Sequence, residues 1–316
     1  SDTVLVFVLL LATWALLRST ERNQVRWFVL AMALVGVGFN IKMMQAYLVL
    51  PAFVMAWTLA PEPRSSAIPN TSHDGLVQTV AARTRRQAIR NRFGGLVLGT
   101  IVLLIVSFSW ATVVQLIPDE NRPYIGSTGD NNIFSLIFEY NGINRLIPEG
   151  WSVFGITNGD ASNAATSGRG GVGENGPVGI FRLLDTDLGG QIGWLIPIAV
   201  IGLIVAWGWR QPWRIGIVRT HLILWGMWFF TMVVFFSVAG YYHRYYLTML
   251  GPAIAALTGI GLVALWRAGR NGGPAALLLP AALIATVASQ IRILQDYPAW
   301  ADRLMPWMIG ATVFAA

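Results

Sequence analysis

The sequence contains no cysteine and few charged residues. Without cysteine the chain forms no disulfide and no thiolate metal or redox centre. Charged residues are 12% of the 316 residues, whereas roughly a quarter is typical of soluble domains, so an ordinary soluble domain is excluded. The three histidines, His73, His221 and His243, are too dispersed to show the spacing of metal ligands. No Ser-His-Asp arrangement, Walker loop or HExxH helix is present.

What the sequence has in abundance is apolar side chains. Hydrophobic residues make up 55% of the chain and the mean hydropathy is +0.57. The 14 tryptophans and 33 glycines suit a membrane protein, because tryptophan anchors helices at the bilayer interface and glycine is frequent in transmembrane helices. The composition therefore predicts an integral membrane protein.

The apolar runs are continuous and show no period-two alternation, which predicts transmembrane helices. A bilayer core needs about 20 mostly apolar residues per helix. Eight runs approach this length and a ninth is partial: 4–17, 27–40, 43–60, 94–117, 191–209, 222–240, 247–266, 274–289 and 304–316. The expected fold class is all-α, a polytopic transmembrane helix bundle of about eight to nine spans.

The charged residues indicate how the bundle is oriented. If residue 2 lies outside and successive runs cross the membrane, 14 of the 22 basic residues lie on the inside and 12 of the 15 acidic residues lie outside. A basic excess in the inner loops is the positive-inside rule, so the net charge of +7 reflects topology. The arginines at 83–92 then face anionic lipid headgroups, and no nucleic-acid partner is expected.

Two long connections divide the chain. Transmembrane helices fill 1–117, with a basic cytoplasmic loop at 61–92 whose arginine-rich end can lie as an interfacial helix. An extracytoplasmic region follows at 118–190, and its Gly/Asn/Ser-rich stretch at 158–179 predicts a flexible part. Further transmembrane helices fill 191–316. The chain begins and ends close to apolar runs, so we interpret it as a portion of a longer polypeptide.

Two polar clusters interrupt the apolar pattern on the outer side. The first surrounds Lys42 in GFNIKMMQAY (38–47), between two runs with almost no loop. Lys42 is either a lysine that snorkels at a helix end or a cation that meets a phosphate or carboxylate. The second cluster, GYYHRYY (240–246), is either an aromatic belt or a functional site, and a histidine and an arginine among the tyrosines favour function. Asp2, at the outer end of the first run, is a metal ligand, a base or a solvated helix start.

These segments resemble a known family. The stretches GFNIKMMQAYLVLP (38–51), YHRYYLTMLGPAIAA (242–256), NNIFSLIFEYNG (131–142) and LGGQIGWLIP (188–197) resemble bacterial family 39 glycosyltransferases of the YkcB type. That family is similar to protein mannosyltransferases and the aminoarabinose transferase ArnT. The resemblance implies a GT-C architecture, in which a cavity on the extracytoplasmic side takes a sugar from a polyprenyl-phosphate carrier.

The resemblance also implies roles for particular residues. Lys42 and Arg244 would hold the lipid-linked phosphate, where the leaving group develops negative charge. The other substrate-binding residues that it implies are Gln45, Tyr47, His243, Tyr245 and Tyr246, and the ring-bearing residues of 243–246 lie either near a divalent cation or against the sugar. Asp2 resembles the acid at the start of a helix in the family, and we expect it to be catalytic. The family's general base would lie upstream of Ser1.

The leading hypothesis is therefore an inverting glycosyltransferase of the cytoplasmic (inner) membrane, multi-pass, with its active face extracytoplasmic. It would use a polyprenyl-phosphate-linked sugar. No cofactor is certain, and the sequence leaves open whether a divalent cation takes part. Two alternatives remain open. One is a non-catalytic structural subunit that works with membrane protein partners, and the other is a polytopic transporter or flippase. An outer region of more than 70 residues fits a cavity cover better than a transport pathway.

Overall fold

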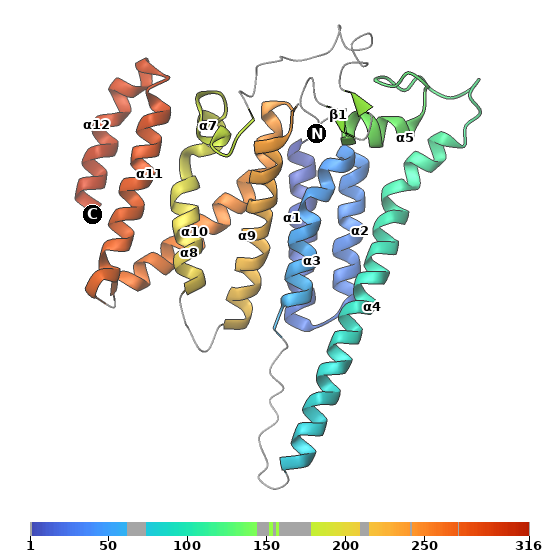
Figure 1. Cartoon of the computed structure of the whole chain (residues 1–316), viewed down its shortest axis with the longest axis horizontal. Helices are drawn as coiled ribbons and strands as arrows, with labels where there is room; N and C mark the ends of the chain where they lie inside the picture. Colours follow the sequence, from blue (N-terminus) through green and yellow to red (C-terminus); the bar gives the residue numbers. More distant parts are fainter. Residues whose placement is uncertain are drawn as a thin grey trace. The chain divides into compact units, whose positions relative to one another are not determined.

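A computed structural model describes residues 2–61, 74–143, 152–153, 156–157, 178–208, 215–240, 242–270 and 272–315. The described chain is almost entirely helical, which confirms the predicted all-α polytopic bundle (Figure 1). Its residues group into two compact units. The first unit holds 3–113 and 212–224, and the second holds residue 2, 114–211 and 225–316.

The first unit is built from four α-helices, one 3₁₀ helix and the beginning of a further helix, α9 (Ile215–Val238). These are α1 (Asp2–Arg22), α2 (Val25–Lys42), the 3₁₀ helix η1 (Met43–Val49), α3 (Leu50–Leu59) and most of α4 (Asp74–Gln115). At 1.5 Å per residue, α1 and α2 are about 31 and 27 Å long. Both helices extend beyond the apolar runs expected at 4–17 and 27–40, because polar residues at their ends continue the helix toward the headgroup region.

Helices α2 and α3 form an antiparallel hairpin. The ring of Phe28, near the start of α2, stacks on that of Trp57, near the end of α3, at 4.8 Å between centroids. At the other end, a Cβ on Gly38 would lie 3.4 Å from the Cβ of Ala46, so the chain reverses between these residues. The reversal occurs at Met43, whose φ of 47° breaks the helix. Helices η1 and α3 together are about 29 Å long, enough for the hydrocarbon core.

Helix α4 is longer than one membrane crossing. It runs without a break over 42 residues, of which Ile89–Gln115 form the apolar part. The arginine-rich segment at 83–92 thus lies within the same continuous helix as the apolar part and is not a separate interfacial helix, since no proline lies between residues 74 and 115 to end it. Residues 62–73 of the expected basic loop lie outside the described residues.

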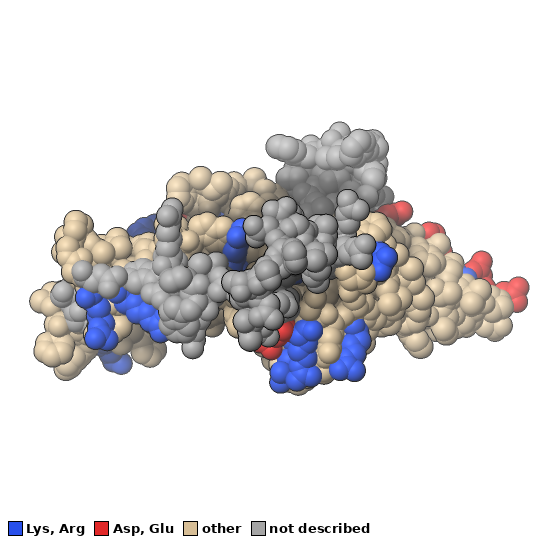
Figure 2. Space-filling view, turned by 90° about the horizontal axis from the view of Figure 1, so that it is seen from below, with Lys and Arg blue, Asp and Glu red and all other residues tan. Residues whose placement is uncertain are grey.

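Basic residues gather at one end of the first unit. The indole N–H of Trp57 donates to the carbonyl of Arg92 at 3.1 Å, and the guanidinium of Arg92 donates to the carbonyl of Thr58 at 2.8 Å. Helix α1 ends at this level with Arg22, and α2 begins here near Arg26. Figure 2, which looks from below, shows basic side chains in blue on this face. Lys42 lies at the opposite end of α2, which we call the Lys42 end.

The second unit combines long helices with short segments. The helices are α7 (Thr186–Ile192), α8 (Ile196–Gly208), α10 (Gly251–Arg270), α11 (Leu278–Leu294) and α12 (Pro298–Ala315), and α9 (Ile215–Val238) is divided between the units after residue 224. The shorter elements are α5 (Ile133–Ser135), the π-helix η2 (Leu136–Ile143), β1 (Ser152–Val153), β2 (Ile156–Thr157), and the 3₁₀ helices η4 (Arg182–Leu184), η5 (Gly193–Leu195), η6 (Arg244–Leu250) and η7 (Gly273–Leu277). Strands β1 and β2 pair antiparallel.

The core of the second unit lies where α8, α10 and α11 meet. Ile198, Leu265 and Ala282, one from each helix, form a buried cluster. Helices α8 and α10 cross at Gly202 and Gly261 so closely that a Cβ on Gly202 would lie 2.3 Å from the Cα of Gly261. Small residues at a crossing let helix backbones approach, as is typical of membrane helices.

Seven segments of the described chain are long and apolar enough to cross a membrane: 2–22, 25–59, 89–115, 188–208, 216–238, 244–270 and 273–294. The hairpin of α2 and α3 accounts for two of the runs that the sequence predicts, 27–40 and 43–60. The partial ninth run lies in α12, which is not among the seven. The chain is thus a multi-pass membrane protein. Most of the predicted glycine-rich stretch, 158–177, lies outside the described residues.

Candidate functional site

The Lys42 end of the first unit is a helix break that carries polar side chains. Lys42 is the last residue of α2 and is half-buried. A cation is favourable there, because the carbonyl end of a helix carries partial negative charge. Asp2 begins α1 and is 8% exposed. A Cβ on Gly38 would lie 3.1 Å from Leu5, one turn after Asp2, so α1 begins at the level of this break.

Two predicted substrate-binding residues, Gln45 and Tyr47, lie in η1. Gln45 is buried, and both its amide nitrogen and its amide oxygen lack a hydrogen-bond partner. The hydroxyl of Tyr47 is also buried without a hydrogen bond of good geometry. It lies close to the hydroxyl of Ser107 on α4, which is likewise buried without such a bond. A buried polar group without a partner costs about 1–3 kcal/mol, so this region has unused hydrogen-bonding capacity.

Helix α4 holds this end of the hairpin in place. The side-chain amide of Asn40 donates to the carbonyls of Gly36, on its own helix, and of Val106, on α4, at 3.0 and 2.8 Å. The ring of Phe39 packs between those of Tyr47 and Phe108, at centroid distances of 4.9 and 5.3 Å. The position of Tyr47 is therefore set by α2 and α4 together.

The second predicted cluster lies in the second unit, where η6 begins. His243 is the residue before η6 and its carbonyl accepts the N–H of Tyr246 at 2.9 Å. The His243 ring stacks on the ring of Tyr245 at 5.0 Å and meets the edge of the Tyr246 ring at 5.8 Å. Tyr246 is buried, Tyr245 is 54% exposed, and Arg244 is half-buried. The four residues, called the His243 cluster below, thus form one aromatic and cationic group.

Next to this cluster lies an arginine that the sequence analysis did not single out. Arg182, in η4, is 4% exposed, and its Nη1 donates to the carbonyls of Phe236 and Ala239 at the end of α9, at 3.2 and 2.6 Å. Its guanidinium lies 5.0 Å from the ring centroid of Tyr242. Burial raises the pKa of Tyr242 to about 12, and Arg182 opposes part of this rise. No sequence pattern marks Arg182, because its partners lie more than 50 residues away.

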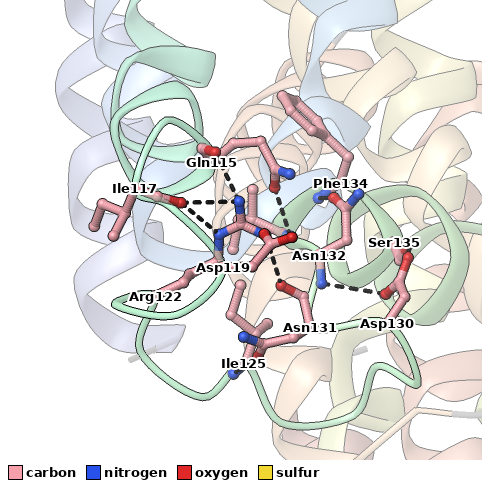
Figure 3. A network of polar contacts seen from close by, with 11 residues as sticks. Gln115, Ile117, Asp119, Arg122, Ile125, Asp130, Asn131, Asn132, Phe134 and Ser135 are labelled. Carbon is pink, nitrogen blue, oxygen red and sulfur yellow. Dashed lines mark hydrogen bonds and ion pairs between the residues drawn. The ribbon is translucent and has the colours of Figure 1, made fainter.

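Another arginine organises the segment after α4 (Figure 3). Arg122 donates to the carbonyls of Gln115 and Ile117 at 2.9 Å each, and it pairs with Asp119 at 2.8 Å. A guanidinium at these positions satisfies the carbonyls at the end of α4 and suits the negative end of the helix. The side chain of Asn131, also in this network, accepts the N–H of Ile125 at 2.6 Å.

The carboxylates of this region have mostly structural partners. Asp130 accepts the Ser135 hydroxyl at 2.8 Å and the N–H of Asn132 at 3.2 Å. The bond from Ser135 lowers the pKa of Asp130 below its ordinary value. Glu139 lies in η2 and is exposed. Among the residues that the structure describes, no three His, Asp or Glu side chains gather as a metal site would require.

The predicted site residues thus fall into two groups. Lys42, Gln45 and Tyr47 lie together at the Lys42 end of the first unit, and His243 to Tyr246 lie together in the second unit. The joint action of Lys42 and Arg244 on one phosphate stays a prediction. Ser107 and Arg182 are the two neighbours that the structure adds to these groups.

Comparison with known proteins agrees with the resemblance described above. Residues 1–73, which include Lys42, match the family described as dolichyl-phosphate-mannose-protein mannosyltransferase. Two proteins of Bacillus subtilis strain 168 are similar over almost the whole chain. "Putative mannosyltransferase YkcB" is 32% identical over 389 residues, 99% of this chain and 50% of that protein. "Putative mannosyltransferase YycA" is 30% identical over 383 residues, 98% of this chain and 51% of that protein. The chain spans about half the length of these relatives, and no solved structure matches it.

Proposed function

We propose that this chain is the membrane-embedded part of a glycosyltransferase that transfers a sugar from a polyprenyl-phosphate donor to an extracytoplasmic acceptor. The observation that carries the proposal is the helix break at Met43. The break leaves Lys42, Gln45 and Tyr47 at one end of an apolar bundle, within the residues that match a mannosyltransferase family. Polar and ionisable groups are costly in such a bundle and are typical of functional sites.

The chemistry assigns a task to each kind of group. In the transfer, the acceptor hydroxyl loses its proton to a carboxylate base, its oxygen bonds to the anomeric carbon, and the bond from that carbon to the phosphate oxygen breaks. The departing polyprenyl phosphate gains negative charge, which a cation at Lys42 stabilises. The amide of Gln45 and the hydroxyl of Tyr47 supply uncharged donors and acceptors, which suit sugar hydroxyls.

The His243 cluster supports the same proposal from the second unit. Stacked rings give sugar rings an apolar face to pack against, and the imidazole and guanidinium supply polar contacts. We assign a role in substrate binding to His243, Arg244, Tyr245 and Tyr246. We assign a catalytic role to Asp2. We also propose that the membrane is the cytoplasmic one and that the active face is extracytoplasmic; the basic end of the first unit supports this orientation through the positive-inside rule.

A transfer assay tests the proposal. Membranes that contain the protein are incubated with polyprenyl-phosphate mannose and then with other polyprenyl-phosphate sugars, with and without a divalent cation, and the release of polyprenyl phosphate is measured. We expect release that is lost in Lys42→Ala and His243→Ala and partly kept in Lys42→Arg. Arg18→Ala is the control, because Arg18 lies near the opposite end of the first unit in an exposed ion pair.

Lysine acylation gives a second readout that needs no turnover. Lys42 is the only lysine in the sequence, so acylation of the peptide that contains it, followed by mass spectrometry, reports on this side chain. We expect the donor to slow acylation of Lys42 severalfold. The proposal is refuted if no donor leads to release of polyprenyl phosphate and no donor protects Lys42 from acylation. That result would favour the structural-subunit or transport alternatives.

A further inference from the structure

Arg182 is unusual among the charged residues that the structure describes. It is buried, at 4% exposed, whereas Lys42 and Arg244 are half-buried. Burying a guanidinium costs several kcal/mol unless it is paired and hydrogen-bonded. A residue held at such a cost in a short 3₁₀ helix needs specific partners to offset it.

Two carbonyls at the end of α9 are among the partners of Arg182. Its Nη1 donates to Phe236 at 3.2 Å and to Ala239 at 2.6 Å. The last carbonyls of a helix lack intrahelical donors and carry partial negative charge. A guanidinium therefore both donates hydrogen bonds to them and offsets their charge. The segment is attached once more nearby, since the N–H of Gly179 donates to the carbonyl of Ser237 at 3.0 Å.

Tyr242 connects this attachment to the His243 cluster. Its side chain is 1% exposed, its ring lies 5.0 Å from the guanidinium of Arg182, and its hydroxyl donates to the carbonyl of Phe236 at 3.0 Å. Arg182 and Tyr242 therefore share one carbonyl acceptor, and a cation over a tyrosine ring adds to the attraction. Tyr242 directly precedes His243, so immobilising Tyr242 immobilises the backbone from which the His243 side chain projects.

We propose that Arg182 is a positioning residue for the His243 cluster: it joins the segment 178–184, the end of α9 and Tyr242 into one rigid support that sets the place of the His243 ring. The inference rests on the proposed function in so far as it assigns the cluster to substrate binding. Lysine can replace Arg182 only in part, because an ammonium can donate to both carbonyls as the single Nη1 does, but it lacks the planar guanidinium that packs over the Tyr242 ring.

The rate of His243 modification tests the proposal without turnover. Membranes with the wild-type protein and with Arg182→Gln, Arg182→Lys and Tyr242→Phe are treated with an imidazole-acylating reagent, and modification of the His243 peptide is followed by mass spectrometry. We expect Arg182→Gln to raise the rate about tenfold, because the loss of charge-assisted hydrogen bonds makes local opening more frequent. Arg182→Lys is expected to restore part of the protection.

The matched control is Arg292→Gln. The Arg292 side chain is 57% exposed and its ion pair with Asp296 measures 3.7 Å, so its loss should leave the His243 rate unchanged. Folded Arg182→Gln protein in which His243 reacts at the wild-type rate would overturn the proposal. If that variant does not accumulate in membranes, Tyr242→Phe decides, since it removes one hydroxyl donor only and should raise the rate about threefold; a wild-type rate there would also overturn it.

Transfer kinetics separate this proposal from the proposed function. A positioning role predicts that Arg182→Gln lowers kcat per folded molecule and that Arg182→Lys restores part of it, whereas a loss of folded protein alone would leave kcat per folded molecule and KM unchanged. If the wild-type protein releases no polyprenyl phosphate, the proposed function fails. The modification rates then still decide whether Arg182 positions His243.

Discussion

The crossing of α8 and α10 makes a sharp prediction about stability. Gly261 faces Gly202 across this crossing, and a Cβ on Gly261 would lie 2.6 Å from the Cα of Gly202. Gly259 is two residues away on the same helix and has open space around its Cβ position. Gly261→Ala and Gly259→Ala therefore add the same methyl group to the same helix, one against backbone and one into open space.

The expected cost follows from the distances. Ordinary contact begins near 3.4 Å, so Gly261→Ala must separate the two backbones locally by about 0.8 Å, and a gap of that size loses a quarter to a half of the dispersion energy of the contacts that it opens. Overpacking of this kind costs about 1–3 kcal/mol. Gly259→Ala should instead gain up to about 1 kcal/mol in helix propensity, because alanine is the better helix former.

The assay is thermal unfolding of each variant in detergent. The quantity measured is the fraction of protein that stays monodisperse after heating. Gly261→Ala should melt several degrees below the wild-type protein, and Gly259→Ala at or above it. Gly202→Ala should resemble Gly261→Ala, because its Cβ would lie 2.3 Å from the Cα of Gly261. Equal melting temperatures for Gly259→Ala and Gly261→Ala would refute the reasoning that backbone contact governs this crossing.

Three further predictions concern charged and titratable groups. Lys42→Ala should lose about 2–4 kcal/mol of transition-state stabilisation, which is measured as a lower kcat for transfer. An unchanged kcat would remove Lys42 from the mechanism. Because burial raises the pKa of Tyr242 from 10.0 to about 12, its contribution to stability is present below pH 10 and lost as the pH rises toward 12; Tyr242→Phe should lack this alkaline loss in melting curves. Arg122→Gln should speed the labelling of a cysteine placed at the buried Ile125 about tenfold, because the carbonyls at the end of α4 lose their donors, and the cysteine-free chain gives no background.

Hydropathy predicted the membrane spans well because the hydrocarbon core of the bilayer requires predominantly apolar residues along the whole span. The runs at 27–40 and 43–60 were correctly separated at Lys42, since a cation and two amides interrupt an otherwise apolar stretch. The left-handed φ of 47° at Met43 could not be predicted, because methionine has no preference for that conformation. Likewise, an interfacial helix over 83–92 was a reasonable expectation from charge alone, and only the continuous α4 shows otherwise.

The contacts around the candidate residues were harder to predict from the sequence than the helices that carry them. Arg182 and Ser107 lie in segments without a distinctive pattern, and their importance comes from contacts made across the fold. Arg182 meets carbonyls 54 and 57 residues away, and Ser107 lies close to a tyrosine on another helix. Local propensity and hydropathy carry no information on such pairs.

The two groups of site residues share a structural setting that explains why polar side chains gather there. Lys42 precedes η1 and His243 precedes η6, and each 3₁₀ helix has seven residues and leads directly into an α-helix of a span. A 3₁₀ helix rises about 2.0 Å per residue and aligns side chains three apart, so each segment carries its polar groups about 14 Å before the α-helix begins. His243 and Tyr246 are three apart and their rings meet at 5.8 Å. Lipid tolerates irregular backbone only where protein or water covers it. At both breaks, protein or water must therefore cover the irregular backbone, which supports the proposal that a polar donor substrate binds there.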